Sequence, residues 1–569
     1  MMSNVMGVDL LSRAYFPKDV HVVEIPARRK GGTIDITTEE ISNGGYAIPT
    51  AVSQAIRRAS QLGLKEVWLG GAPGDHNRWD HSVGTFNVGL FWLKTLEEDH
   101  RVPAHCLETP LSSWNRLRAM LGTALLLHDY GHLPFAHMME EVLRSINWLP
   151  SAREPGLEAA VLRHRFEEPV LVGTWQSVLN SATGPDVASP INSLQIRTII
   201  EQLIQGSHAV PWLQTIVNSP VDADKIDYLR FDSEFIKDKA FPVRHRLLQD
   251  KPTQWLADFL SDQDVNHAGL LCLHGRSAVA AADLWRERIF FYDRLYLAPE
   301  LRVPERMALE IVQQFVIRSV MSPGFLERAG IPRVRGFSNS LQALNLKASC
   351  SADGLIRLKY GIVRDAMIAL LDMIEGETLE LGLLKRMMHL LGETPSIDSG
   401  CKEFLSAGFN ELMSLNTTDP SQRGTCRLRD VVNRCLVREP ITIARESFDD
   451  AVEALRPLQH VYSREMLIDV ARLPAVLSGL RRRKAGTKNE DNVDYSILVP
   501  SGPVETWAPG VKAKLPLCDS VVKHLERPYC RVIIIAPGVA NSARGAYLWD
   551  RTRTTLIEAG IEPLEKGVD

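Results

Sequence analysis

With 569 residues, the chain is longer than one hydrophobic core usually supports, so one large domain with an appended lobe, or two to three domains, is expected. Hydrophobic residues make up 45% and charged residues 24%, a balance that excludes bulk disorder. The formal net charge of -4 argues against a dedicated nucleic-acid coat, although it leaves room for a local basic pocket.

The cysteines and the apolar runs bear on the compartment. None of the eight cysteines forms a CxxC pair, so neither a disulfide framework nor a structural zinc knuckle is expected, and a reducing compartment fits best. The N-terminus lacks the apolar core of a signal peptide, and runs such as 532–536 are too short to span a bilayer. We therefore predict a cytoplasmic protein.

In chain order, the pattern predicts a mainly helical protein. Residues 1–47 form an N-terminal extension with short strand-like pieces. A helix is predicted over 51–62, ended by Gly63, and helical periodicity continues to about residue 480. The segment 265–273 is the exception and predicts a short hairpin. The predicted parts are a main domain over 48–330, a helical region over 331–490 and a small α/β lobe over 491–569.

The predicted lobe contains strands at 495–499 and 530–536 and helices at 520–525 and 547–559. Four basic residues, 481–484, open a polar stretch that runs to Asn492. A solvated surface loop is the simpler interpretation of this stretch. The alternative is a phosphate-binding patch for nucleic acid or a regulatory nucleotide.

Three segments contain candidate catalytic or metal-binding residues, and the first two contain histidines. His81 follows Arg78 at the start of an apolar-periodic segment, where a lone histidine is usually structural. The second segment is an apolar helix, 117–127, that runs into His128 and Asp129. Two ionisable groups at the end of a buried helix are costly unless they are paired or ligated, and a divalent cation would accept both. His132 lies one helical turn later, and Pro134 would bend the chain so that His137 returns to the site.

The third segment, 219–232, has the features of a helix N-terminus. Ser219 is predicted as the cap, followed by Pro220 at the first position. Asp224, Tyr228 and Asp232 recur every four residues and so share one helix face. Beside the histidines, this face suggests a metal ligand followed by substrate contacts.

Together these segments resemble the HD-domain phosphohydrolases, and more closely the branch that contains the bacterial dGTPases and the SAM-and-HD-domain dNTPase. The matching stretches are 61–63 (QLG), 73–82 (PGDHNRWDHS), 128–137 (HDYGHLPFAH) and 222–228 (DADKIDY), within about residues 48–310. The resemblance implies an HD-domain fold for this part of the chain. With the hairpin and the lobe predicted from the pattern, the expected fold class is a mainly α-helical HD-domain fold with short β-hairpin insertions and a small C-terminal α/β lobe. The N-terminal 47 residues are too few for a SAM domain, and no allosteric nucleotide site can be carried over.

The resemblance also implies roles for individual residues. The metal ligands would be His81, His128, Asp129 and Asp224. The residues around the scissile phosphate would be His132, His137 and His164. Because the departing 5′ oxygen needs a proton, we predict His137 as the proton donor, with His132 stabilising charge. The triphosphate would be bound by Arg78, Lys225 and Arg288, and the sugar or base would be contacted by Gln61, Leu62, Tyr228, Asp232 and Tyr296.

The expected reaction is hydrolysis of a deoxynucleoside triphosphate to deoxynucleoside and triphosphate, with a divalent metal as cofactor. Mixed nitrogen and oxygen ligands suit Mn, Fe, Co or Zn, and Mg at an oxygen-rich position. Two alternatives remain open: an HD nuclease or phosphodiesterase acting on single strands, DNA ends or a signalling nucleotide, and a non-catalytic nucleotide sensor. A regulatory nucleotide, a homo-oligomer and a role in nucleotide-pool control or antiphage defence are compatible with the resemblance.

Overall fold

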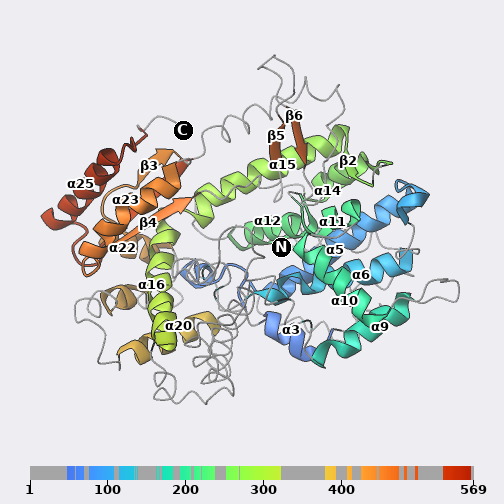
Figure 1. Ribbon diagram of the computed structural model, residues 1–569, viewed down its shortest axis with the longest axis horizontal. Coiled ribbons are helices and arrows are strands. Elements are labelled where there is room, and N and C mark those ends of the chain that lie inside the picture. Colours follow the sequence, from blue (N-terminus) through green and yellow to red (C-terminus); the bar gives the residue numbers. More distant parts are fainter. Residues whose placement is uncertain are drawn as a thin grey trace, which may run out of the picture.

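The computed structural model is mainly helical and describes most of the residues from 48 to 321, followed by shorter segments towards the C-terminus (Figure 1). The described residues are 48–57, 59–69, 76–107, 114–132, 135, 138, 162, 166, 169–182, 192–206, 210–219, 221–236, 252–267, 269–321, 379–392, 406–412, 425–444, 447–472, 480–483, 494–497 and 529–564. The predicted strands before residue 48 and the predicted helix 520–525 lie outside these ranges. In the described part of the chain, no helix is both long and apolar enough to cross a membrane.

Three helices form the centre of the helical body. α5 (Arg78–Glu98) begins after Asn77, whose side chain accepts a hydrogen bond from the backbone N–H of Asp80. α6 (Trp114–Leu127) is as apolar as the sequence predicts and packs against α5, which also packs against α12 (Ala223–Ile236). The surrounding helices are α3 (Thr50–Arg57), α4 (Lys65–Trp68), α9 (Val172–Ala182), α10 (Ser193–Gln205), α11 (Pro211–Val217) and α14 (Pro252–Ser261).

Two predicted details of these helices are wrong. The first helix ends at Arg57, and Gly63 adopts its left-handed conformation (φ 59°) in the following loop. α12 begins four residues after Ser219, because Asp222 accepts the backbone N–H of Lys225 at 2.8 Å and so caps the helix. Asp222 also accepts the backbone N–H of Ser219 at 2.9 Å, which closes the preceding turn.

The hairpin predicted over 265–273 is confirmed. β1 (Gln263–Val265) pairs antiparallel with β2 (Leu271–Leu273), with Asp264 opposite Cys272. The chain then enters α15 (Gly275–Phe291), continues through a π-helical turn, η4 (Tyr292–Tyr296), and forms α16 (Pro299–Met321). α16 contacts α4, η4 and two strands of the C-terminal sheet, so it joins the helical body to that sheet.

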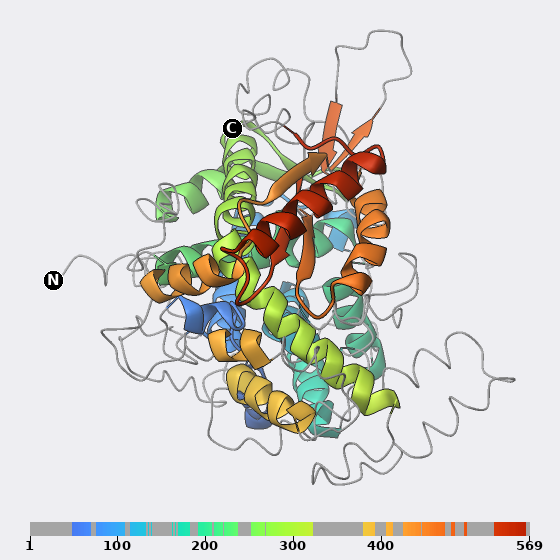
Figure 2. The same cartoon turned by 90° about the vertical axis from the view of Figure 1, so that its left-hand side faces the viewer.

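The C-terminal lobe is built on a three-stranded antiparallel sheet in the order β3 (Ile441–Ala444), β7 (Tyr529–Ile535), β4 (Leu467–Arg472). α23 (Phe448–Val461) packs against β4 and against α25 (Ala543–Glu558), and Figure 2 shows α25 lying across the sheet. β7 matches the strand predicted at 530–536. The other two strands come from the range 331–490, which the pattern assigned to helices, so the sheet does not respect the predicted boundary at 490. Elsewhere in that range, α20 (Leu379–Gly392) and α22 (Thr425–Cys435) are helical, as predicted.

The basic stretch at 481–484 differs from the predicted loop. Residues Leu480–Arg483 form β5, which pairs with β6 (Asp494–Ile497), and Arg483 lies opposite Asp494. A strand places alternate residues on opposite faces, so the basic residues of β5 do not share one face.

Candidate metal centre and substrate cavity

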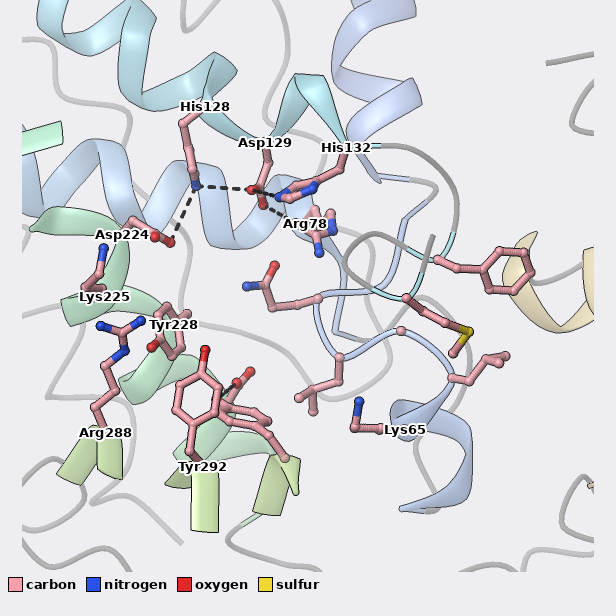
Figure 3. Close-up of a pocket in the computed structure, with 18 of the residues that line it drawn as sticks. Lys65, Arg78, His128, Asp129, His132, Asp224, Lys225, Tyr228, Arg288 and Tyr292 are labelled. Atoms are coloured by element: carbon pink, nitrogen blue, oxygen red, sulfur yellow. Dashed lines mark hydrogen bonds and ion pairs between the residues drawn. The ribbon is translucent and has the colours of Figure 1, made fainter. Parts of the chain in front are cut away.

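Three helix-borne side chains bring their donor atoms to one point. His81 from α5 places its Nε2 3.0 Å from Asp224 Oδ1 of α12 and 3.2 Å from His128 Nε2, which follows α6. The ligand atoms of these three residues all lie within 4.8 Å of one another. Figure 3 shows His128 and Asp224 facing each other from separate elements. We call this group the metal end, because it lies at one end of a cavity.

Hydrogen bonds on the far side of each ring suit the group to a metal. The Nδ1 of His81 lies 2.9 Å from Asp227 Oδ2, and the Nδ1 of His128 lies 2.7 Å from the carbonyl oxygen of Leu125. Each Nδ1 therefore donates its proton away from the site, which leaves both Nε2 lone pairs directed inward, 3.2 Å apart. Two lone pairs at that separation repel unless a cation or a proton lies between them. The donor set therefore fits a divalent cation.

The charges around the two imidazoles also favour a positive charge at this point. Burial alone would lower the pKa of His81, but hydrogen bonds to Asp224 and Asp227 raise that pKa to about 10. Burial opposes ionisation of Asp224 as well, yet His128 and His81 hold the pKa of its carboxyl well below the usual range. A metal ion bound by this charged cluster would therefore displace protons.

Asp129, the fourth predicted ligand, has two further partners beside the three converging side chains. Its Oδ2 lies 2.8 Å from Arg78 Nη1, and its Oδ1 lies 3.2 Å from His132 Nε2 and 3.5 Å from His128 Nε2. The carboxylate is 7% exposed and lies outside the tight group of three. Asp129 thus links the metal end to Arg78 and His132, and the predicted phosphate ligand Arg78 is paired with it.

The backbone conformation after α6 determines where the side chains of His128, Asp129 and His132 point. His128–Gly131 form a 3-10 turn, η2, and His132 follows in an extended conformation. The predicted α-helical turn from His128 to His132 is therefore wrong, although His132 still reaches the site through Asp129. His137 and His164, together with Pro134, lie outside the described residues.

Asp227 is a site residue that the sequence analysis missed. It is fully buried, and its carboxylate accepts from His81 and, at 2.6 Å, from Arg230. α5 makes room for it with Gly84, because a Cβ at this position would lie 2.2 Å from Asp227 Oδ1. The available signal was the spacing of Asp227 three residues after Asp224 and of Gly84 three residues after His81.

The metal end opens into a cavity of about 490 Å³ that collects the predicted substrate residues. The face of α12 holds as predicted, since Asp224, Tyr228 and Asp232 all line the cavity. Figure 3 shows Lys225, Tyr228 and Arg288 close together below Asp224. The lining residues named from the sequence are Gln61, Leu62, Arg78, His128, Asp129, His132, Asp224, Lys225, Tyr228, Asp232, Arg288 and Tyr296.

Several of these side chains are already paired. Lys225 Nζ lies 2.5 Å from Asp222 Oδ2. Asp232 is buried between His76, whose Nε2 lies 2.6 Å from Oδ1, and Tyr296, whose hydroxyl donates to Oδ2. Asp232 therefore orients Tyr296, and His76 is a second residue that the sequence analysis missed. Among the described residues, Gln61 Oε1 is buried without a hydrogen-bond partner.

The opposite end of the cavity consists of charges paired with one another. Lys65 of α4 is paired with Glu305 of α16, and Arg302 Nη1 lies 3.0 Å from Glu305 Oε2. Arg302 also forms two bonds to Asp469 of β4, at 2.7 and 3.0 Å. We call Lys65, Glu305 and Arg302 the ion-pair end. Nothing in the local sequence pattern pointed to it.

The comparisons with known proteins show distant likeness. No family model matches the chain. An uncharacterised protein of Mycoplasma pneumoniae is 26% identical over 33% of the chain, and the uncharacterised protein YwfO of Bacillus subtilis is 25% identical over 33%. A protein of Acanthamoeba polyphaga mimivirus, named provisionally as HD domain-containing, is 24% identical over 33%. The matches span 38%, 35% and 38% of these relatives, little more than a third of their length.

Among solved structures, a phosphohydrolase from Bacteroides thetaiotaomicron aligns with 86% of this chain and 93% of its own. Its TM-score of 0.44 and identity of 13% are too low to support an argument about activity. The mimivirus relative supports the HD-superfamily part of the interpretation, and no relative's name points to the dNTPase branch.

Proposed function

We propose that the protein hydrolyses deoxynucleoside triphosphates to deoxynucleoside and triphosphate. One observation carries the proposal: a single cavity is lined by metal-binding side chains, cationic side chains and tyrosines. Its volume of about 490 Å³ falls within the range of about 300–1,000 Å³ that small-molecule sites occupy. A nucleotide needs these three kinds of contact for its reacting phosphate, its charged tail and its sugar and base.

The cationic residues suit a triphosphate. The Arg288 guanidinium lies over the Tyr292 ring, 5.5 Å from its centroid. Burial would lower the pKa of this guanidinium, but the neighbouring Tyr228 and Tyr292 raise it. A guanidinium that stays charged in a cavity compensates phosphate oxygens without competition from water. Lys225 adds a second cation. Its ammonium is paired with Asp222, and phosphate oxygens would share it with that carboxylate.

A divalent cation held by His81, His128 and Asp224 would lower the pKa of a water molecule and offset charge on the phosphate. The remaining tasks fall to the protein. Arg78 and His132 border the same end and are held by Asp129, and in the proposal they would stabilise charge on the α-phosphate. The water oxygen gives up one proton to solvent and bonds to the α-phosphorus, the bond from the α-phosphorus to the 5′ oxygen breaks, and that oxygen takes a proton from a histidine. We assign that proton to His137, as predicted from the sequence.

The sugar and base would lie beside Gln61, Tyr228 and Tyr296. Gln61 Oε1 is a buried acceptor that a sugar hydroxyl would satisfy. Tyr228, fixed next to Tyr296 with ring centroids 6.5 Å apart, would leave no room for a 2′ hydroxyl. Leu62 supplies apolar surface for the base.

The test is incubation of the purified chain with each dNTP and rNTP, singly and in mixtures, with Mn²⁺ or Mg²⁺, and chromatography of the products. We expect deoxynucleoside and triphosphate from dNTPs, and no turnover by His128→Ala. Tyr228→Ala should lose the preference for deoxy substrates, and His137→Ala should lose turnover while retaining metal. Absence of turnover in every mixture would refute the proposal, and cleavage of single strands or cyclic nucleotides in parallel samples would establish the alternative enzyme class.

A further inference from the structure

A second set of metal-ligand side chains lies on the hairpin β1–β2, outside the substrate cavity. Asp264 of β1, Cys272 of β2 and His274 just after β2 bring their ligand atoms within 4.8 Å of one another. None of them lines the cavity, and Figure 1 shows β2 at the opposite side of the molecule from the C-terminal lobe. This group is therefore independent of the metal end.

The hairpin register makes this arrangement a consequence of the backbone. Asp264 lies directly opposite Cys272, and directly opposed residues have Cβ atoms about 4.5–5.5 Å apart on one face. His274 follows Cys272 by two residues and so returns to the same face. The inward residues Val265, Leu271 and Leu273 are buried and hold the strands in this register.

One of the three ligand separations already matches that around a metal, and all three lie within 4.8 Å. His274 Nε2 lies 3.3 Å from Asp264 Oδ1. Around a tetrahedral zinc ion with bonds of about 2.0 to 2.3 Å, neighbouring ligand atoms lie roughly 3.3 to 3.7 Å apart. The side chains of Asp264 and His274 are 55% and 43% exposed, so they can adjust to this geometry and leave a coordination position open to solvent.

We propose that Asp264, Cys272 and His274 form a second metal site that binds Zn²⁺. One sulfur, one nitrogen and one oxygen ligand suit zinc better than magnesium or calcium, which prefer oxygen alone. Cys272 forms no disulfide, and metal binding would release its thiol proton to solvent. The resulting thiolate and the Asp264 carboxylate together neutralise the two charges of the ion.

The site would fix the entry to α15. His274 directly precedes Gly275, the first residue of α15, and the backbone N–H of His274 donates to the carbonyl oxygen of Asp262 at 2.8 Å. α15 carries Arg288 into the substrate cavity. Metal on the hairpin therefore ties β1, β2 and the start of this helix together. CxxC spacing is not needed, because the ligands come from two paired strands.

The test uses the full chain, stripped of metal with a chelator and titrated with Co²⁺. A thiolate bound to Co²⁺ gives a ligand-to-metal charge-transfer band, and the metal end contains no sulfur that could give one. We expect the band in the natural chain, its loss in Cys272→Ser, and its bleaching by Zn²⁺. Asp264→Asn should weaken Co²⁺ binding at this site by at least about tenfold, since even outer-shell changes cost about 10- to 100-fold.

Cys106→Ser is the matched control. Cys106 lies beside the turn of the same hairpin, with its Sγ 3.8 Å from the carbonyl oxygen of Asn266, but is not part of the group of three. This variant should keep the band. A natural chain without the band, or a band that survives in Cys272→Ser, would overturn the proposal. Both outcomes are independent of dNTP hydrolysis, which is measured separately.

Discussion

At the metal end of the cavity, His81, His128 and Asp224 direct donor atoms at a common point, whereas at the ion-pair end each charge has a partner. Lys65 and Arg302 share Glu305, and Arg302 also binds Asp469 of the C-terminal sheet. Donor atoms that converge on one point from several elements suit a ligand, and charges that pair only with one another hold elements together. The same cavity wall therefore has a chemical end and a structural end.

The largest effect should follow from removing a ligand at the metal end. Asp224→Asn replaces the carboxylate that faces both imidazoles by a neutral amide of the same shape. We expect bound metal and turnover to fall below measurable levels, with the circular dichroism spectrum unchanged. Asp550→Asn, at a carboxylate whose side chain is 64% exposed, is the control and should behave like the natural chain. Full metal content in Asp224→Asn would show that the Asp224 carboxylate is not a metal ligand.

At the ion-pair end, the largest expected change is in stability. Arg302→Met leaves Asp469 and Glu305 buried without their shared cation, and breaking a buried pair from one side costs about 3–5 kcal/mol. Urea unfolding measures this loss. Arg434→Met, which breaks an exposed bidentate pair with Glu411, should cost less than about 1 kcal/mol. Equal losses in the two variants would remove the distinction between a structural end and a surface pair.

A smaller loss is expected behind the metal end. Asp227→Asn keeps an oxygen for His81 Nδ1 but removes the charge that makes the imidazole a stronger ligand. Metal affinity, measured by calorimetric titration, should fall about 10- to 100-fold, as is usual for such partners. Arg230→Gln removes the neighbouring pair of the same carboxylate and leaves the imidazole contact, so its affinity should change less. A larger fall in metal affinity in Arg230→Gln than in Asp227→Asn would show that the Asp227 carboxylate acts mainly through Arg230 and not through His81.

Gly84→Ala tests how closely α5 and α12 approach beside the centre. The added Cβ would meet Asp227 Oδ1 at 2.2 Å, and overpacking of this kind costs about 1–3 kcal/mol. Gly173→Ala in α9 is matched to it, because a Cβ there has no atom within 4 Å. That control should be neutral or gain up to about 1 kcal/mol in free energy of unfolding. A neutral Gly84→Ala would mean that the helices separate easily.

The smallest predicted effect is a pH dependence at the ion-pair end. Burial would raise the pKa of Glu305, but Lys65 and Arg302 hold it below its ordinary value of 4.5. The folded chain therefore binds this proton less readily than the unfolded chain, so the stabilisation is present above pH 4.5 and is lost as the pH falls through the folded pKa. Thermal unfolding of Glu305→Gln below pH 4.5 should depend less steeply on pH than that of the natural chain. Parallel curves would contradict this assignment.

The sequence predicted what depends on local pattern. The apolar run ending in His128, the four-residue spacing from Asp224 to Asp232 and the hairpin at 265–273 all gave the observed elements. Contacts between distant segments were not predictable. The Lys65–Glu305 and Arg302–Asp469 pairs join residues 240 and 167 positions apart, and β3 and β4 become a sheet only through β7. The direction of Asp129 depended on a 3-10 turn where an α-helical turn was expected.

The central proposal, that this cavity directs water to the α-phosphorus of a nucleotide with the 5′ oxygen as the leaving group, is tested most directly by turnover in ¹⁸O-labelled water. Mass spectrometry of the two products locates the label. The account predicts one ¹⁸O in the triphosphate and none in the deoxynucleoside, and no products from His128→Ala. Label in the deoxynucleoside, or release of a nucleoside monophosphate with pyrophosphate, would contradict it.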